Sequence, residues 1–276
     1  MRTIAHLSDL HFGTEVPSVL DALGAEINAR APSLVVVSGD LTQRARRRQF
    51  AAARDFLAQL PQPQLIIPGN HDIPLFDVAR RFFAPLVHYR AFISAELNPH
   101  FSDDEIHVLG LNTARSFTWQ NGRISRDQIA LLQQQLSAAR QRIKIVVTHH
   151  PFIPPPNDAG IALVGRAALA IPLLDRHGAD LLLAGHLHRG YAGDIRPHYP
   201  SSQRSFISAQ AGTAISGRTR DEPNAYNWIT VEPDRIRIVV RAWNGSAFEP
   251  IRETIYQRDG TGWSPFADGA PTPKPF

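Results

Sequence analysis

The sequence predicts an α/β protein in which two sheets pack together and helices lie on the outside. Up to about residue 188, short apolar runs of strand length alternate with segments of helical periodicity. After His188 the pattern changes to strand-like segments separated by turns, with no long helix. Two packed sheets best accommodate this order. We therefore expect a single domain over residues 1–260, followed by a Gly- and Pro-rich tail over residues 261–276.

The expected strands are short runs of apolar, often β-branched residues bounded by turn residues. In the first part of the chain they cover residues 3–7, 34–37, 65–67, 106–111, 143–147 and 181–184. In the last part they cover residues 205–209, 226–232, 235–242 and 248–257. The run Leu-Val-Val-Val at 34–37 suits a strand that is buried on both faces. The segment 235–242 alternates in part, as a half-exposed antiparallel strand does.

The expected helices cover residues 19–30, 46–60, 126–140 and 166–177. Ser18 is in position to cap the first helix, and Ser125 with Gln128 fits a capping box for the third. Pro172 should kink the fourth helix or mark an N-terminal turn.

Two further segments lack a regular pattern. Between residues 74 and 99, Phe76, Phe82, Phe83 and Phe92 indicate short helices that pack over the sheet. The dense basic cluster Arg44, Arg46, Arg47 and Arg48 reads as the solvated first turn of a helix.

Composition places limits on the class of protein. The chain has 276 residues, of which 43% are apolar, enough for a sizeable core. A net charge of +4 favours anionic substrates but does not by itself indicate nucleic-acid binding. The absence of cysteine excludes disulfides and thiolate metal sites. Asp9, His11 and Glu15 interrupt the N-terminal segment where the apolar region of a secretory signal would lie. The longest apolar segment, 161–174, is too short to span a bilayer. We therefore expect a cytoplasmic protein without a membrane partner.

Five of the predicted strands are followed at once by residues that can bind metals. The motifs are Ser8-Asp9-Leu10-His11, Ser38-Gly39-Asp40, Gly69-Asn70-His71-Asp72, Thr148-His149-His150-Pro151 and Gly185-His186-Leu187-His188. In open α/β sheets, ligands bind outside the carboxyl ends of the strands. Ordinary core strands give no reason for this recurrence, whereas a metal site does.

The candidate ligands are two carboxylates, one amide and four imidazoles. They are Asp9, His11, Asp40, Asn70, His149, His186 and His188. This mixture suits iron, manganese or zinc, because calcium and magnesium prefer oxygen ligands alone. Seven residues are too many for one tetrahedral ion but enough for two ions that share a bridging carboxylate. A metal pair can activate water and stabilise an in-line displacement at phosphorus.

Taken in chain order, these motifs resemble the calcineurin-like metallophosphoesterase superfamily over about residues 3–188. The size and the later stretch Ala211-Gly212-Thr213-Ala214 with Asn227 resemble the class III cyclic nucleotide phosphodiesterases of bacteria. The resemblance implies a four-layered α/β/β/α sandwich with two mixed sheets packed face to face. It also implies hydrolysis of a small phosphodiester, either a 3',5'-cyclic nucleotide such as cAMP or a glycerophosphodiester, by a metal-bound hydroxide. The alternatives are a phosphomonoesterase or nuclease of the same superfamily, or a non-catalytic scaffold.

The resemblance also implies a role for each motif residue. Asp9, His11 and His188 would hold one metal, Asn70, His149 and His186 the other, and Asp40 would bridge both. His71 would act on the leaving-group side as the catalytic residue.

Several roles stay open at this stage. His150 either contacts substrate or packs, and Asp72 either orients His71 or caps the next helix. The loops 117–121 and 154–158 could line the cleft, with Phe117, Trp119 and Asn121 as candidates. A homodimer is a further possibility.

Overall fold

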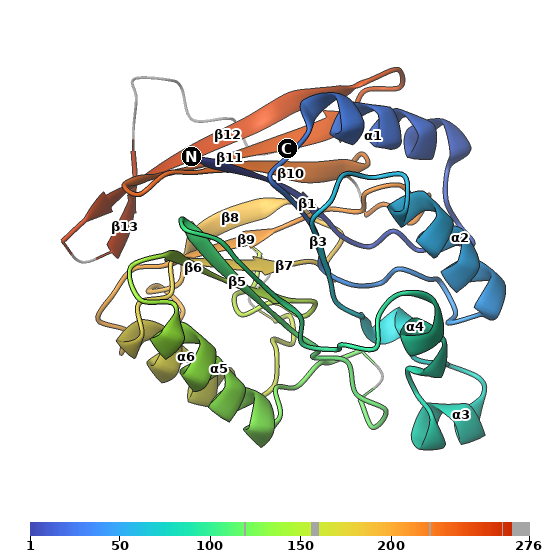
Figure 1. Cartoon of the computed structure of the whole chain (residues 1–276), viewed down its shortest axis with the longest axis horizontal. Coiled ribbons are helices and arrows are strands. Elements are labelled where there is room, and N and C mark those ends of the chain that lie inside the picture. The colour runs from blue at the N-terminus through green and yellow to red at the C-terminus, as the bar shows by residue number, and fades with distance from the viewer. Residues whose placement is uncertain (119, 156–159, 221, 261, 267–276) are drawn as a thin grey trace.

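The computed structural model describes residues 1–118, 120–155, 160–220, 222–260 and 262–266. Two sheets pack face to face, with helices on both outer sides (Figure 1). The first sheet contains β1 (Arg2–Leu7), β2 (Leu34–Val37), β3 (Gln64–Ile66), β10 (Ala225–Val231), β11 (Arg235–Trp243), β12 (Phe248–Asp259) and β13 (Gly262–Pro265). The second contains β4 (His100–Ser102), β5 (Ile106–Leu111), β6 (Ile143–Thr148), β7 (Leu181–Ala184), β8 (Tyr191–Asp194) and β9 (Ile207–Gln210).

Both sheets are mixed, as the family resemblance implies. The first has the order β13-β12-β11-β10-β1-β2-β3, in which β1, β2 and β3 are parallel and β10 joins β1 antiparallel. The second has the order β4-β5-β6-β7-β9-β8, with β5, β6, β7 and β9 parallel and an antiparallel strand at each edge. The parallel strands of both sheets bring their carboxyl ends to one edge of the sandwich.

Alternating side chains build the four layers. Ile4 and Val36 face the core between the sheets, whereas Ala5 and Val35 face the opposite side. The helices are α1 (Pro17–Arg30), α2 (Arg47–Leu57), α3 (Val78–Phe83), α4 (Val87–Phe92), α5 (Arg126–Ala138) and α6 (Ala167–Arg176). The helices α1 and α2 cover the outer face of the first sheet, and α5 and α6 cover that of the second. The α/β/β/α sandwich is therefore confirmed.

Helix starts agree only in part with the sequence-based expectation. The helix α1 begins at Pro17, and Ser18 is not its cap, because proline already has the φ angle of the first helical position. The predicted capping box of α5 is confirmed. Ser125 Oγ accepts the N–H of Gln128 at 3.1 Å, and Gln128 Oε1 accepts the N–H of Ser125 at 2.8 Å.

The segment 74–99 forms the short helices α3 and α4, but its aromatic rings do not all pack over the sheet. The expectation for Phe76, Phe82 and Phe83 was wrong, because these side chains are 78%, 42% and 90% exposed. Leu86 and Tyr89 occupy the buried positions instead.

Some expectations fall at the edge of the described chain. Residues 262–265, inside the expected tail, form β13 against β12. Trp119 and residues 156–159 of the expected cleft loops, together with 267–276, lie outside the described residues. Among the described residues, no helix combines the length and the apolar character needed to cross a bilayer.

Candidate metal centre

All seven predicted ligands lie at the carboxyl ends of strands, where the two sheets meet. Asp9 and His11 follow β1, Asp40 follows β2, and Asn70 opens the 3-10 turn η1 (Asn70–Asp72) after β3. The loop after β6 carries His149, and the loop after β7 carries His186 and His188. The ligand atoms of Asp9, His11 and His188 all lie within 4.8 Å of one another, as do those of Asp9, Asp40 and His149. The structure thus brings together residues that are up to 179 positions apart in the sequence.

Asp40 lies between two groups of ligand atoms. Its Oδ2 is 3.7 Å from His11 Nε2, and its Oδ1 is 3.4 Å from His149 Nε2. On the His11 side, Asp9 Oδ1 lies 3.4 Å from His188 Nε2. On the His149 side, Asn70 Oδ1 lies 3.1 Å from His149 Nε2. One carboxylate therefore contacts both halves of the cluster.

The backbone of the motifs is unusual. Five of the predicted ligands have positive φ angles, namely Asp9 (53°), His11 (47°), Asp40 (54°), His186 (73°) and His188 (60°). Residues other than glycine rarely adopt this left-handed conformation, and such strain concentrates at functional sites. His186 and His188 need a curved loop to direct both side chains into one site. Their positive φ angles provide this curvature.

The motif glycines allow the loops to approach closely. A Cβ atom at position 69 would lie 2.1 Å from Asp40 Oδ1. At position 185 it would lie 1.7 Å from Ser8 Oγ and 2.6 Å from Asp9 Oδ2. Any larger residue at Gly69 or Gly185 would therefore displace a predicted ligand.

Backbone carbonyls orient the imidazole rings. His149 Nδ1 donates to the carbonyl oxygen of Ser38 at 2.8 Å, and His188 Nδ1 donates to that of Arg218 at 2.8 Å. Each ring then presents Nε2 to the cluster, a common arrangement for metal-binding histidines. Thr213 Oγ1 also lies 2.7 Å from His188 Nδ1, which gives the stretch 211–214 a physical role beside the site.

Asp72 has a defined structural role. Its buried carboxylate accepts the N–H groups of Gly69, Leu41 and Thr42 at 2.9–3.1 Å. It caps η1 and ties that turn to the loop after β2, while His71 Nδ1 donates to the carbonyl oxygen of Gln43 at 3.0 Å instead. Burial raises the pKa of Asp72 to about 6, with a contribution from Asp40.

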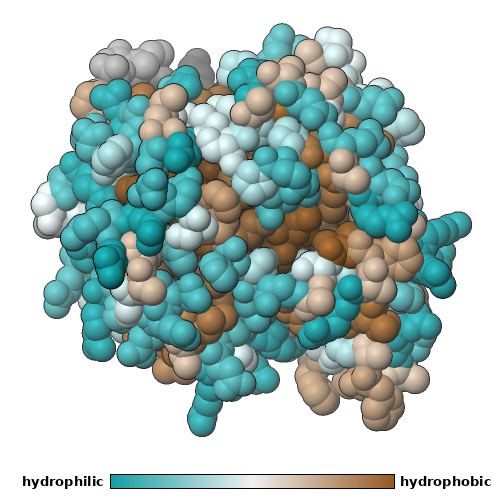
Figure 2. Space-filling view, in the orientation of Figure 1, coloured by the Kyte–Doolittle hydropathy of each residue, from teal (hydrophilic) through white to brown (hydrophobic). Residues whose placement is uncertain are grey.

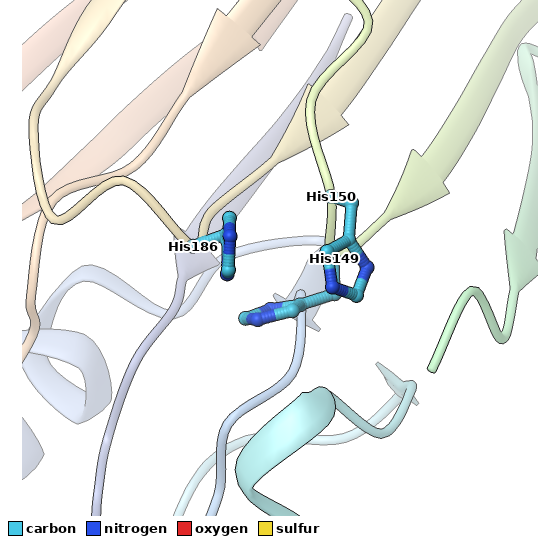
Figure 3. A group of neighbouring side chains, drawn as sticks. All are labelled: His149, His150 and His186. Carbon is cyan, nitrogen blue, oxygen red and sulfur yellow. The ribbon is translucent and has the colours of Figure 1, made fainter. Parts of the chain in front are cut away.

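His150 lies against the cluster as well. Its Nδ1 is 2.7 Å from Thr113 Oγ1, and its buried Nε2 has no hydrogen-bond partner among the described residues. Figure 3 shows His149 and His150 on the loop after β6 and His186 on the loop after β7, and their ligand atoms form one group within 4.8 Å. The expectation that His149 is the ligand of the pair stays a prediction. It is supported by the contacts of His149 with Asp40 and Asn70.

The electrostatics suit a cation. Burial opposes ionisation of Asp9 and Asp40, but neighbouring imidazoles, above all His188 and His149 respectively, hold both pKa values well below the usual range. Burial lowers the pKa of His149, but Asp40 and Asp9 outweigh it and raise the value to about 9. Burial and His149 lower the pKa of His186 to about 3.

The donor atoms fit a metal centre. Asp9 Oδ1 is completely buried and has no hydrogen-bond partner among the described residues. A buried carboxylate oxygen that accepts no hydrogen bond is costly, and a metal ion held between it and the nearby Nε2 atoms of His11 and His188 would satisfy it.

A cavity of about 240 Å³ opens directly over the cluster. Asn70, His71, His186, His188, Arg218 and Arg220 line it. A second cavity of about 260 Å³ shares Asn70, His71 and Arg218 with the first and extends to Arg44 and Arg81. A larger cavity of about 660 Å³, lined by Arg140, Lys144 and Arg204 among others, contains none of the predicted site residues.

Arg218 was not predicted from the sequence. Its Nη1 lies 3.0 Å from Gln43 Oε1 and 3.3 Å from His71 Nε2, so a guanidinium borders the cavity beside the predicted catalytic residue. The only sequence signal is its place in the polar segment Ser216-Gly217-Arg218-Thr219-Arg220, shortly after the stretch that resembles cyclic nucleotide phosphodiesterases.

A four-layered sandwich with Asp, Asn and His clustered at its strand ends is the arrangement of a metallophosphoesterase. The chain belongs to the calcineurin-like phosphoesterase family, whose model matches residues 2–190.

Curated relatives are similar at low identity. The glycerophosphodiester phosphodiesterase GpdQ of Enterobacter lignolyticus is 27% identical over 162 residues, which cover 55% of this chain and 57% of that protein. A probable cyclic nucleotide phosphodiesterase of Rhodopseudomonas palustris is 28% identical over 253 residues, which cover 84% and 89%. The match thus spans little more than half the length of the GpdQ relative.

Solved structures confirm the fold. A purple acid phosphatase from yellow lupin seeds superposes with a TM-score of 0.68 at 12% identity, covering 94% of this chain and 54% of that one. A dimetal phosphatase from Danio rerio gives a TM-score of 0.62 at 16% identity, covering 87% and 96%. At such identities the likeness concerns the fold alone.

Proposed function

We propose that this protein is a metal-dependent phosphodiesterase that hydrolyses small phosphodiesters, either a 3',5'-cyclic nucleotide such as cAMP or a glycerophosphodiester. The observation that carries the proposal is the position of Asp40, whose two oxygens face His11 on one side and His149 on the other. The names of the relatives, glycerophosphodiester phosphodiesterase and probable cyclic nucleotide phosphodiesterase, support this substrate class.

In this proposal each half of the cluster holds one metal ion. Asp9, His11 and His188 would hold the first, Asn70, His149 and His186 would hold the second, and Asp40 would serve both. Iron, manganese and zinc all suit this combination of oxygen and imidazole donors. When bound, the pair would supply an activated water and positive charge for an in-line displacement at phosphorus.

His71 is the proposed acid on the leaving-group side. Because its Nδ1 donates to the carbonyl oxygen of Gln43, its Nε2 faces the cavity. To act as this acid, His71 would carry a proton on Nε2 as well as on Nδ1, with Arg218 Nη1, 3.3 Å from Nε2, turned toward the substrate phosphate. When the P–O bond breaks, the leaving oxygen would take the proton from Nε2. Arg218 and Arg220 line the same cavity, and their guanidinium groups would orient the anionic phosphate by charge-assisted hydrogen bonds.

The size of the site favours a small substrate over a nucleic acid. The cavity over the cluster has a volume of about 240 Å³, slightly below the usual range for small-molecule sites, and the adjoining cavity adds about 260 Å³. A phosphomonoesterase activity is the closest alternative, since the same set of donor atoms would serve it.

We also propose a cytoplasmic location for the protein. The homodimer stays a prediction.

A substrate panel tests the proposal. Metal-free protein would be reloaded separately with Mn²⁺, Fe²⁺ or Zn²⁺ and assayed on bis(p-nitrophenyl) phosphate, cAMP, glycerophosphocholine, p-nitrophenyl phosphate and a single-stranded oligonucleotide. We expect metal-dependent turnover of the small diesters, with lower rates on the monoester and the oligonucleotide. Loss of all diester activity in protein shown to contain metal would contradict the proposal.

A further inference from the structure

Exposed apolar side chains cluster on and around α3. Six of the ten large apolar side chains that the described residues leave exposed lie here, namely Phe76, Val78, Phe82, Phe83, Val87 and Phe117, hereafter the α3 patch. Phe83 and Phe117 are 90% and 83% exposed, and the rings of Phe82 and Phe117 lie 5.1 Å apart. In Figure 2 apolar residues gather at the lower right corner, where Figure 1 places α3. Exposed patches of this kind mark interaction sites.

The α3 patch lies within the most basic part of the chain. Residues 42–92 contain eight arginines, three aspartates and neither lysine nor glutamate, which gives a net charge of +5. The whole chain has a net charge of only +4, so this segment accounts for all of its positive excess.

One arginine contacts the α3 patch directly, because the guanidinium of Arg44 lies 5.7 Å from the ring centroid of Phe76. The guanidinium of Arg47 lies 5.6 Å from the ring centroid of Phe92, a half-buried side chain of α4 outside the patch. Exposed Arg46 and Arg48 are next to them at the start of α2. The basic cluster that the sequence suggested to be only a solvated helix turn therefore borders an apolar surface.

The α3 patch also adjoins the candidate active site. The 260 Å³ cavity runs from Arg44 and Leu75 at the patch to His71 and Arg218. On the other side, Phe83 and Val87 help to line an apolar groove of about 490 Å³.

We propose that the α3 patch docks on the surface of an anionic phospholipid bilayer. Aromatic and aliphatic side chains would enter the headgroup region while the flanking arginines contact lipid phosphates, the mode of binding known for interfacial helices and basic clusters. Docking of this kind needs no spanning helix. It revises the sequence-based expectation that the protein has no membrane partner, and it does not depend on the proposed catalytic function.

Two other occupants fit less well. In a symmetric dimer the patch would face a copy of itself and oppose two strongly basic surfaces. Single-stranded nucleic acid would stack on aromatic rings in a groove, whereas this patch includes Val78 and Val87 and lies on a helix that projects from a corner of the molecule (Figure 1).

Vesicle flotation with the full chain tests the proposal. Vesicles of phosphatidylcholine alone would be compared with vesicles that also contain phosphatidylglycerol, at low and high salt. We expect binding to the anionic vesicles that weakens with salt. The double variant Phe76→Ser/Phe83→Ser should lower the affinity about tenfold or more, because it removes apolar surface from the bilayer contact. The control Leu169→Ser changes a side chain that is 52% exposed on α6 and should bind like the unaltered protein.

Two charge-reversal double variants measure the electrostatic contribution to vesicle binding separately from the apolar one. Arg46→Glu/Arg48→Glu should abolish the preference for anionic vesicles, whereas Arg140→Glu/Arg176→Glu, at exposed positions just after α5 and at the end of α6, should keep it. Turnover of a soluble diester would be measured in all variants and should not change.

Three results would overturn the proposal. The first is an absence of flotation with anionic vesicles, and the second is an equal loss in patch and control variants. The third is that the unaltered protein does not bind vesicles but self-associates or binds the oligonucleotide, and that the patch variants abolish this association or binding.

Discussion

At the scale of single residues, Asp40 and His71 make separable predictions. Asp40→Ala should remove activity and reduce the bound metal, because one carboxylate contacts both halves of the cluster. His71→Ala should lower the rate about a hundredfold or more while both metals stay bound, as loss of a general acid does. Metal content by elemental analysis, measured together with diester turnover, distinguishes the two. Equal metal loss in both variants would show that the role given to His71 is wrong.

His6 makes a prediction about pH. It is fully buried between Ser38 Oγ at 2.9 Å and Asn227 Nδ2 at 3.3 Å, and burial lowers its pKa to about 3. Between about pH 6.5 and pH 3 the unfolded chain therefore binds a proton that the folded chain does not, so stability falls as pH falls through this window. The loss should approach about 1.4 kcal/mol per pH unit in the free energy of unfolding.

Urea denaturation at several pH values, with a chelator present, measures this slope. His6→Gln cannot take up the proton, so its stability should decline less steeply than that of the unaltered protein. His198→Gln, at an exposed position, is the control. Identical slopes for His6→Gln and the unaltered protein would exclude His6 as the source.

The sequence could predict which residues carry ligand chemistry, but not what orients them. Asp9, Asp40 and His188 are recognisable because only a few residue types bind metals. The carbonyl oxygens of Ser38, Gln43 and Arg218, which orient the rings, belong to every residue type and so leave no signal. Arg218 reaches His71 across 147 positions, and only the folded chain reveals such a contact.

At the scale of elements, the capping box of α5 makes a stability prediction. Ser125 Oγ satisfies the N–H of Gln128, so Ser125→Ala should lower the free energy of unfolding by about 1 kcal/mol. The control Ser137→Ala lies on the same helix, where its Oγ donates to the carbonyl of Gln133 and lies 3.3 Å from His177 Nδ1 but satisfies no helix-end N–H, so alanine there should change the free energy of unfolding by less. Urea denaturation of both variants tests the difference, and equal effects would contradict a capping role.

Element bounds could be predicted where apolar runs are uninterrupted. The predicted strands 34–37, 106–111 and 181–184 coincide with β2, β5 and β7. The strands β4 and β8 have only three and four residues, and His100-Phe101-Ser102 and Tyr191-Ala192-Gly193-Asp194 contain no apolar run. Such edge strands form because a neighbour offers hydrogen bonds, which local sequence does not reveal. Local sequence likewise did not reveal which of the aromatic residues on and around α3 face the core.

At the scale of the whole molecule, the candidate metal centre joins the two sheets. Asp9, Asp40 and Asn70 come from the first sheet, whereas His149, His186 and His188 come from the second. Hydrophobic alternation could predict two packed sheets, but not how far one is shifted against the other, since apolar side chains pack in many registers. The motifs supply that constraint, because their side chains meet at only one relative placement of the sheets.

Metal binding should therefore stabilise the fold as a whole. An ion that binds only the folded chain, present at about a hundred times its dissociation constant, adds about 2.7 kcal/mol to the free energy of unfolding. We expect the unfolding temperature of metal-free protein to rise with added Mn²⁺ and to fall again with chelator. Asp40→Ala should lose most of this response, whereas Asp55→Ala, at a side chain that is 63% exposed on α2, should retain it. Calorimetry on the three proteins decides the matter: an undiminished response in Asp40→Ala would mean that the stabilising ions bind elsewhere.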